Sequence, residues 1–87
     1  MRYFASAHKN QTLPQDAVEG AFLKMKEGDK ISIMAKESGR FEGRVLHTYD
    51  LKPAVIKVMP DTGFDEYGKE QRFTADQGYS YVGIKRK

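Results

Sequence analysis

The 87-residue sequence contains no cysteine and no tryptophan. Without cysteine it has no disulfide framework, no thiolate ligand for a metal and no thiol nucleophile. Small extracellular domains usually depend on such cross-links, so we expect this protein in the cytoplasm. The sequence also lacks a run of about eighteen apolar residues and any signal-like apolar stretch near its start. We therefore expect neither a membrane span nor secretion.

The charges are nearly balanced. Fifteen Lys and Arg stand against twelve Asp and Glu, which gives a net charge of +3. This excess permits contact with phosphate but does not require it. Hydrophobic residues make up 39% and include five Tyr and five Phe, a composition typical of globular proteins. The length predicts a single domain with one modest core.

The first third of the chain predicts a short strand over residues 2–7 and a helix over residues 12–29. Thr12 is the expected N-cap, Pro14 belongs to the first turn, and Gly28 is expected to end the helix. One face of this helix is apolar at helical spacing and should pack on a core. That face consists of Val18, Ala21, Phe22 and Met25.

From Lys30 onward the apolar period changes to two, which is the spacing of strands. Short turns that contain glycine or proline separate the segments. The expected strands cover residues 30–36, 40–49, 54–59, 71–75 and 79–85. This order predicts an α+β domain, in which residues 1–28 supply a strand and an amphipathic helix. Residues 29–87 would form a small, strongly bent antiparallel sheet of about five strands that closes toward a barrel.

Residues 27–58 carry a pattern of glycines and branched residues across three predicted strands. The pattern consists of Gly28, Asp29, Ile31, Ile33, Gly43, Val45, Ile56 and Val58. It resembles the KOW-type version of the SH3-like barrel, and this resemblance implies an SH3-like barrel and an association with nucleic acid. The family usually has Lys-Gly just ahead of the second strand's Gly-x-Val, whereas this chain has Arg40 and Phe41 there. A glycine within a strand permits a sharp bend or the close approach of another backbone.

The strongest candidate surface lies at the C-terminus, where tyrosines alternate with other residues before a basic tail. If Val82 and Ile84 face the core, alternation places Tyr79 and Tyr81 on the opposite face. Nucleobases could stack on these tyrosines while basic side chains contact phosphates. The basic residues are Lys85, Arg86 and Lys87. Alternatively, the tyrosines cover a second layer and the tail protects an edge strand from aggregation.

A second basic group surrounds the first predicted hairpin and consists of Lys36, Arg40 and Arg44. Arginine can contact phosphate or carboxylate at two points. Because Glu37 and Glu42 lie among them, a solvated hairpin with local ion pairs is the alternative interpretation.

Catalysis has little support in the sequence. His8 and His47 are the only histidines, and with Tyr49, Lys9 and Arg44 they would be the acid, base and binding groups of a metal-independent ribonuclease. Nothing in their spacing shows that they converge, and His47 shares its parity with a predicted buried face. We therefore expect no enzyme.

The acidic stretch from Asp61 to Glu70 contains several oxygen ligands but lacks the spacing of a calcium loop. We expect no metal and no cofactor. The stretch instead predicts a solvated loop, whose Phe64 and Tyr67 could contact a protein partner.

Taken together, these patterns favour a small module that binds nucleic acid, or acts on a ribonucleoprotein or polymerase, without catalysis. The alternative is a protein-interaction domain that modulates a host or cellular complex through a strand edge or through Phe64 and Tyr67. A metal-independent ribonuclease is a third possibility. The sequence leaves the oligomeric state open.

Overall fold

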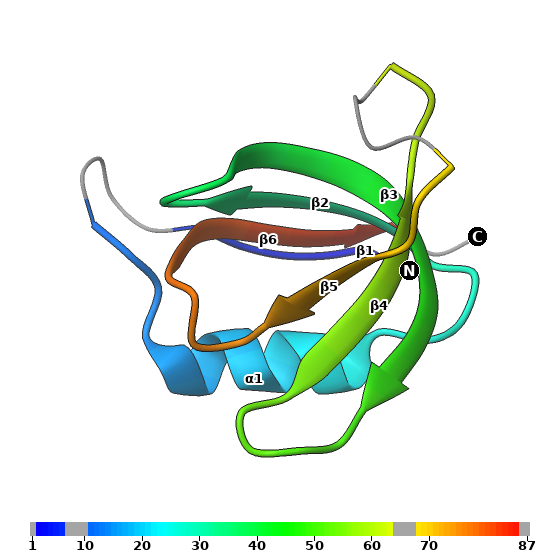
Figure 1. The fold of residues 1–87 in the computed structure, drawn as a ribbon. Helices are drawn as coiled ribbons and strands as arrows, with labels where there is room; N and C mark the ends of the chain where they lie inside the picture. Colours follow the sequence, from blue (N-terminus) through cyan, green and yellow to red (C-terminus); the bar gives the residue numbers. More distant parts are fainter. Residues whose placement is uncertain (1, 7–10, 64–67, 86–87) are drawn as a thin grey trace.

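The computed structural model describes residues 2–6, 11–63 and 68–85, with the backbone alone for residues 2–5. The elements are β1 (Arg2–Ser6), α1 (Gln15–Lys24), β2 (Lys30–Ala35), β3 (Gly39–Tyr49), β4 (Val55–Pro60), β5 (Gln71–Thr74) and β6 (Tyr79–Lys85). The strands form one antiparallel sheet in the order β1-β6-β2-β3-β4-β5. The predicted α+β class is therefore confirmed (Figure 1).

The sheet is strongly bent, and β3 is the strand that both halves share. The first part of this 11-residue strand pairs with β2, and its later part pairs with β4. In Figure 1, β4 and β5 curve away from β2 and β6, and α1 lies beneath the sheet. Closing a sheet into a barrel requires its two edge strands to pair. Among the described residues β1 and β5 do not pair, so barrel closure is not confirmed.

Helix α1 is shorter than predicted at both ends. It begins after Pro14, which makes no side-chain capping bond, so Thr12 is not the N-cap. It ends at Lys24, because the next residue, Met25, adopts an extended conformation with ψ of 139°. Gly28 has φ of 92° and makes the turn that leads into β2. Its left-handed backbone thus serves the turn and does not end the helix.

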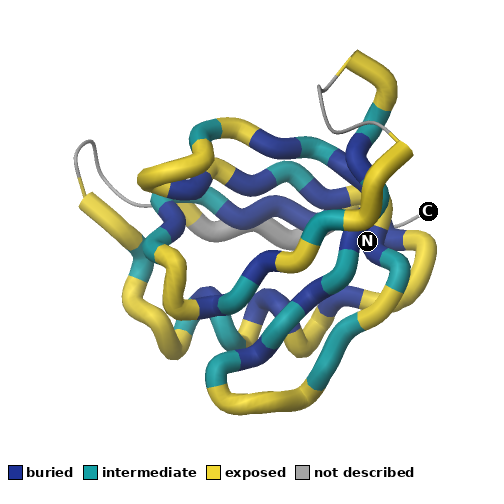
Figure 2. The backbone as a smooth tube through the Cα atoms, in the orientation of Figure 1, coloured by how far each residue is buried: buried dark blue, intermediate teal, exposed yellow. Residues whose placement is uncertain are grey.

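The core lies between α1 and the concave side of the sheet. The predicted apolar face of the helix is confirmed, because Val18, Ala21, Phe22 and Met25 are all buried. Inward residues of the strands complete the core, and Figure 2 shows buried positions alternating along β2 and β3. At the helix–sheet contact, the rings of Phe22 and Tyr79 meet edge to face with centroids 5.6 Å apart.

Gly43 lies where two strands approach closely. A Cβ atom at this position would be 2.5 Å from the carbonyl oxygen of Met59 on β4. No side chain fits there unless the backbone moves, which is the close approach expected of a glycine within a strand.

One β-bulge interrupts the alternation along β3. Val45 pairs with Val58, but the next pair is His47 with Lys57, so Leu46 is an extra residue. An extra residue reverses which side the following side chains face. His47 is consequently exposed, and the prediction that it ends a buried face is wrong.

Candidate functional site

A second β-bulge, at Ser80, changes the expected tyrosine surface. Met34 on β2 pairs with Tyr81, whereas the adjacent Ala35 pairs with Tyr79. The extra residue places Tyr79 on the same side as the buried Val82. Tyr79 is fully buried, so the predicted ladder of two exposed tyrosines is wrong.

Tyr79 has a structural role in the core. Its hydroxyl donates a hydrogen bond to the carbonyl oxygen of Thr74 at 2.7 Å and lies 3.0 Å from Oε1 of Gln77. Burial raises the pKa of this hydroxyl well above its usual value of 10.0, and the negative charge of Asp76 raises it further. The phenol therefore stays protonated in the folded protein under conditions that ionise it in the unfolded chain.

This raised pKa predicts a loss of stability at alkaline pH. A group whose pKa is higher in the folded state stabilises the fold fully below its unfolded pKa and loses that effect as pH rises. At neutral pH, Tyr79→Phe should lower the free energy of unfolding by about 1 kcal/mol through the lost hydrogen bond. Above about pH 10, the gap between wild type and variant should narrow by up to about 1.4 kcal/mol per pH unit.

Urea unfolding from about pH 8 to pH 11 would measure this gap, and the variant itself corrects for the titration of the other groups. A gap that stays constant with pH would show that Tyr79 ionises equally easily in both states.

The outer face of β6, β2 and β3 carries three basic residues side by side. Lys30 on β2 occupies the register position opposite Lys85 on β6 and opposite Arg44 on β3. All three residues are exposed, and we call them the basic row. Neighbouring strands are about 4.8 Å apart, so the row spans about 10 Å of backbone. On β1, Arg2 occupies the next position of the same register.

The basic row concentrates positive charge without full compensation. Like charges directly opposite each other on neighbouring strands are destabilising. Lys30 Nζ lies 4.0 Å from Oδ2 of Asp61, an exposed and weak ion pair. Within the described part of the chain, Arg44 and Lys85 have no ion-pair partner. The row thus presents a fixed positive strip to the solvent.

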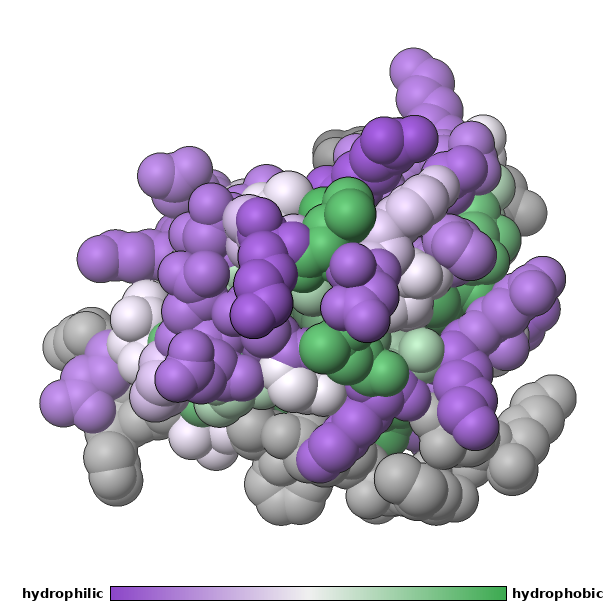
Figure 3. Space-filling model, turned by 90° about the horizontal axis from the view of Figure 1, so that it is seen from below, coloured by the Kyte–Doolittle hydropathy of each residue, from purple (hydrophilic) through white to green (hydrophobic). Residues whose placement is uncertain are grey.

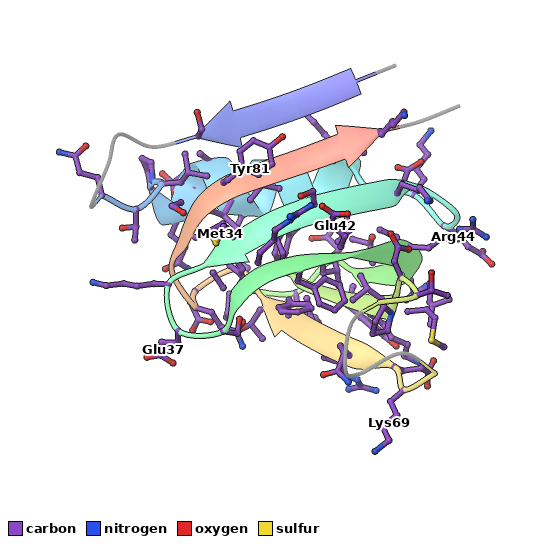
Figure 4. All side chains as sticks on the ribbon, turned by 90° about the horizontal axis from the view of Figure 1, so that it is seen from above. Met34, Glu37, Glu42, Arg44, Lys69 and Tyr81 are labelled. Atoms are coloured by element: carbon purple, nitrogen blue, oxygen red, sulfur yellow. The ribbon has the colours of Figure 1, made fainter. Side chains whose placement is uncertain are left out.

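Tyr81 lies on this same outer face, as strand alternation predicts. Its half-buried ring covers Gly83, because a Cβ atom there would be 2.6 Å from the Tyr81 hydroxyl and 3.0 Å from Cζ. In the register its neighbour on β2 is Met34, which is 38% exposed. Figure 4 shows Tyr81, Met34 and Arg44 on the face viewed from above. One side of the aromatic ring is therefore supported by the backbone of β6.

The two arginines of the first hairpin have different environments. Arg40 forms an ion pair with Glu42, which confirms the alternative interpretation for that residue. Glu42 lies on the same side of β3 as Arg44 (Figure 4). Lys36 is exposed in the turn after β2 and is not part of the basic row. Of the two arginines, Arg44 is the one without an ion pair among the described residues.

Of the predicted catalytic residues that the structure describes, His47 and Tyr49 lie together, whereas Arg44 belongs to the basic row. The ring of His47 packs against that of Tyr49 with centroids 4.6 Å apart. In the ranges that the structure describes, no three His, Asp or Glu residues gather as a metal site would require. Several predicted site residues lie outside the described residues, namely His8, Lys9, Phe64, Tyr67, Arg86 and Lys87.

The underside of the molecule differs from the outer face of the sheet. Leu23 on α1 and Leu51 after β3 are 48% and 56% exposed. Figure 3 shows the apolar side chains of this side as small, separate groups among hydrophilic ones. Isolated apolar residues of this kind are common on protein surfaces.

The chain matches no protein-family model, and no curated protein or solved structure is significantly similar to it. Among the described residues, no helix is sufficiently long and apolar to cross a membrane.

Proposed function

We propose that the protein binds single-stranded nucleic acid on the outer face of β6, β2 and β3, without catalysis. In this proposal the basic row contacts backbone phosphates and Tyr81 stacks against a base. The observation that carries it is the alignment of Lys85, Lys30 and Arg44 across three strands. The partner would be nucleic acid alone or a ribonucleoprotein in the cytoplasm.

Repulsion among the three cations of the basic row favours binding of a negatively charged ligand. A line of like charges disfavours folding unless a ligand of opposite charge offsets the repulsion. A nucleic-acid backbone carries regularly spaced negative charges, and lysine and arginine are its principal protein contacts. The basic row therefore matches a linear polyanion better than it matches a single small anion.

Tyr81 favours a single strand over a duplex. Its ring lies against the strand at Gly83, on the same face as the basic row. Bases in a duplex are already stacked on one another, whereas an unpaired base can stack on an exposed aromatic ring. A protein partner is supported less well, because the large exposed hydrophobic residues of the described chain, Leu23, Met34 and Leu51, belong to three different segments.

We further propose that the bent sheet is a variant of the SH3-like barrel of the KOW type. The close approach at Gly43 and the buried Ile31 and Ile56 support this relation. A structure of the complete chain in solution would test whether the sheet closes.

Two substitutions separate the roles of charge and stacking. Arg44→Gln should make the negative slope of log affinity against log salt shallower by about 0.7, because one phosphate contact to a single strand is lost. Tyr81→Ala should weaken binding by about 1 to 3 kcal/mol, or roughly 5- to 150-fold, with little change in the salt slope. Fluorescence anisotropy with labelled single-stranded RNA and DNA would measure both effects.

Tyr81→Phe is the matched control, because it keeps the ring and should retain most of the affinity. Circular dichroism would verify that each variant is folded. If wild type binds neither RNA nor DNA at low salt, or if Tyr81→Ala binds as well as wild type, the proposal is wrong.

A further inference from the structure

A hollow of about 250 Å³ lies between the start of β3 and β5. Its principal lining residues are Arg40, Phe41, Gln71, Arg72, Phe73 and Gln77. It lies where the sheet is open, because among the described residues β3 pairs with β4 from Gly43 onward and β5 has β4 as its one neighbour. The two sides of the hollow therefore come from strands that are not neighbours in the sheet.

Two aromatic residues, Phe41 and Phe73, line the hollow, and we call their rings its floor. Phe41 and Phe73 pack with ring centroids 4.8 Å apart and an interplanar angle of 57°. Both residues are almost completely buried, so the core holds the floor in place. Aromatic rings prefer offset-stacked or edge-to-face contacts, so another planar ring can pack against either phenylalanine.

Two amide side chains are oriented by contacts beside the hollow. Gln71 donates from Nε2 to the carbonyl oxygen of Lys69 at 3.3 Å, which leaves its Oε1 as an acceptor. The Tyr79 hydroxyl shares its one proton between the carbonyl oxygen of Thr74 and Oε1 of Gln77, which is 3.0 Å away, and this leaves Nε2 of Gln77 as a donor. The lining thus offers one hydrogen-bond acceptor and one donor to a ligand.

Two guanidinium groups lie at the hollow, and none of its described lining residues is acidic. Arg72 has Cζ 5.8 Å from the ring centroid of Tyr49, and Arg40 is held by Glu42. Arg40 also occupies the register position opposite Met34, which in turn pairs with Tyr81. Arg40 therefore belongs both to the lining of the hollow and to the register line that leads across β2 to Tyr81.

We propose that this hollow binds one nucleobase, with the attached phosphate held by Arg40 and Arg72. The ring would lie on the phenylalanine floor while Gln71 and Gln77 hydrogen-bond its polar edge. A volume below about 300 Å³ is smaller than the pockets of drug-sized ligands and suits one ring system. This inference rests on the proposed function and adds to it the site at which base identity is read. The base could belong to a strand or to a free nucleotide.

The strand arm of the test compares the four homo-oligonucleotides, each about eight nucleotides long. Wild type should distinguish its best from its worst oligonucleotide by about 5-fold or more. Gln77→Ala should lower affinity for the preferred one by about 2- to 12-fold, the effect of one hydrogen bond, and leave the salt slope unchanged. Gln15→Ala, an exposed amide at the start of α1, is the matched control and should bind as wild type does.

The nucleotide arm uses nuclear magnetic resonance with each of the four nucleoside monophosphates. Saturable shifts of the Gln71 and Gln77 side-chain amides, lost in Arg72→Gln, would show that the hollow takes the free nucleotide as well. Shifts with oligonucleotides alone would assign the hollow to strands.

The results distinguish this inference from the proposed function. In one outcome, oligonucleotides bind through the basic row, Gln77→Ala and Arg72→Gln leave base preference unchanged, and the side-chain amides of Gln71 and Gln77 do not shift. The base pocket is then wrong and the proposed function stands. If no oligonucleotide binds but a monophosphate shifts the hollow amides, the nucleotide site stands and the proposed function is wrong. An amide response to acidic peptides that exceeds the response to every nucleotide would overturn the base pocket.

Discussion

Replacing Lys30, Arg44 and Lys85 together by glutamine should lower affinity for single-stranded nucleic acid by about 100-fold or more at 0.1 M salt. Each phosphate contact to a single strand contributes a factor of about 5 at this salt concentration relative to 1 M, and three contacts multiply. The negative slope of log affinity against log salt should become shallower by about 2. Anisotropy titrations at several salt concentrations would measure both quantities.

The same variant should not lose stability. Removing like charges that face each other across strands relieves repulsion, so the free energy of unfolding should stay equal or rise by up to about 1 kcal/mol. The matched control replaces Lys26, Lys52 and Lys69, which are exposed and lie in segments outside the strands. It loses the same net charge but should keep the high affinity.

A basic row required only for folding would give the opposite pattern. The triple variant would then unfold more easily and bind as tightly as the control. Equal losses of affinity in the two variants would instead indicate that net charge, and not the alignment of the row, attracts the ligand.

Sequence periodicity predicted the faces of elements wherever the alternation was continuous. The helical stripe that contains Val18 and Phe22 and the inward residues Ile31 and Ile33 of β2 are all buried. Tyr81 lies outward because it is on the same side of the bulge as Val82, from which its orientation was inferred. These residues obey local rules, since each depends only on neighbours in its own element.

The two wrong orientations have one physical cause. Leu46 in β3 and Ser80 in β6 are extra residues, and each reverses the side on which the residues beyond it lie. His47 therefore became exposed and Tyr79 became buried. Neither extra residue is a glycine or a proline, so the sequence does not mark the bulges. The pairing with the partner strand fixes the register, and this pairing cannot be read from the sequence of one strand.

The basic row was beyond sequence reasoning for a related reason. Lys85, Arg44 and Lys30 belong to three strands, and only the pairing of those strands places them side by side. Arg44 and Lys85 were identified as separate candidates, whereas Lys30 was missed. The hollow between β3 and β5 depends even more on tertiary structure, because its two sides come from strands that do not pair.

Phe22→Ala should lower the free energy of unfolding by about 3 to 5 kcal/mol, a typical cost of removing a buried phenylalanine. Its side chain is fully buried in the contact between α1 and the sheet, where it packs against Tyr79. Small domains have only about 5 to 15 kcal/mol of total stability, so this loss would be a large part of it. Urea or thermal unfolding followed by circular dichroism would measure the change.

Leu23→Ala is the matched control, because Leu23 is the next residue of the same helix and is 48% exposed. Its effect should be about 0.5 kcal/mol, as is usual for surface positions. If Phe22→Ala does not fold, Phe22→Leu keeps the comparison possible, with an expected loss of about 1 to 2 kcal/mol because fewer buried carbons are removed. An unchanged melting temperature in both Phe22 variants would mean that α1 does not cover the core in solution. The concave side of the sheet, and not its outer face, would then be the surface left open for a partner.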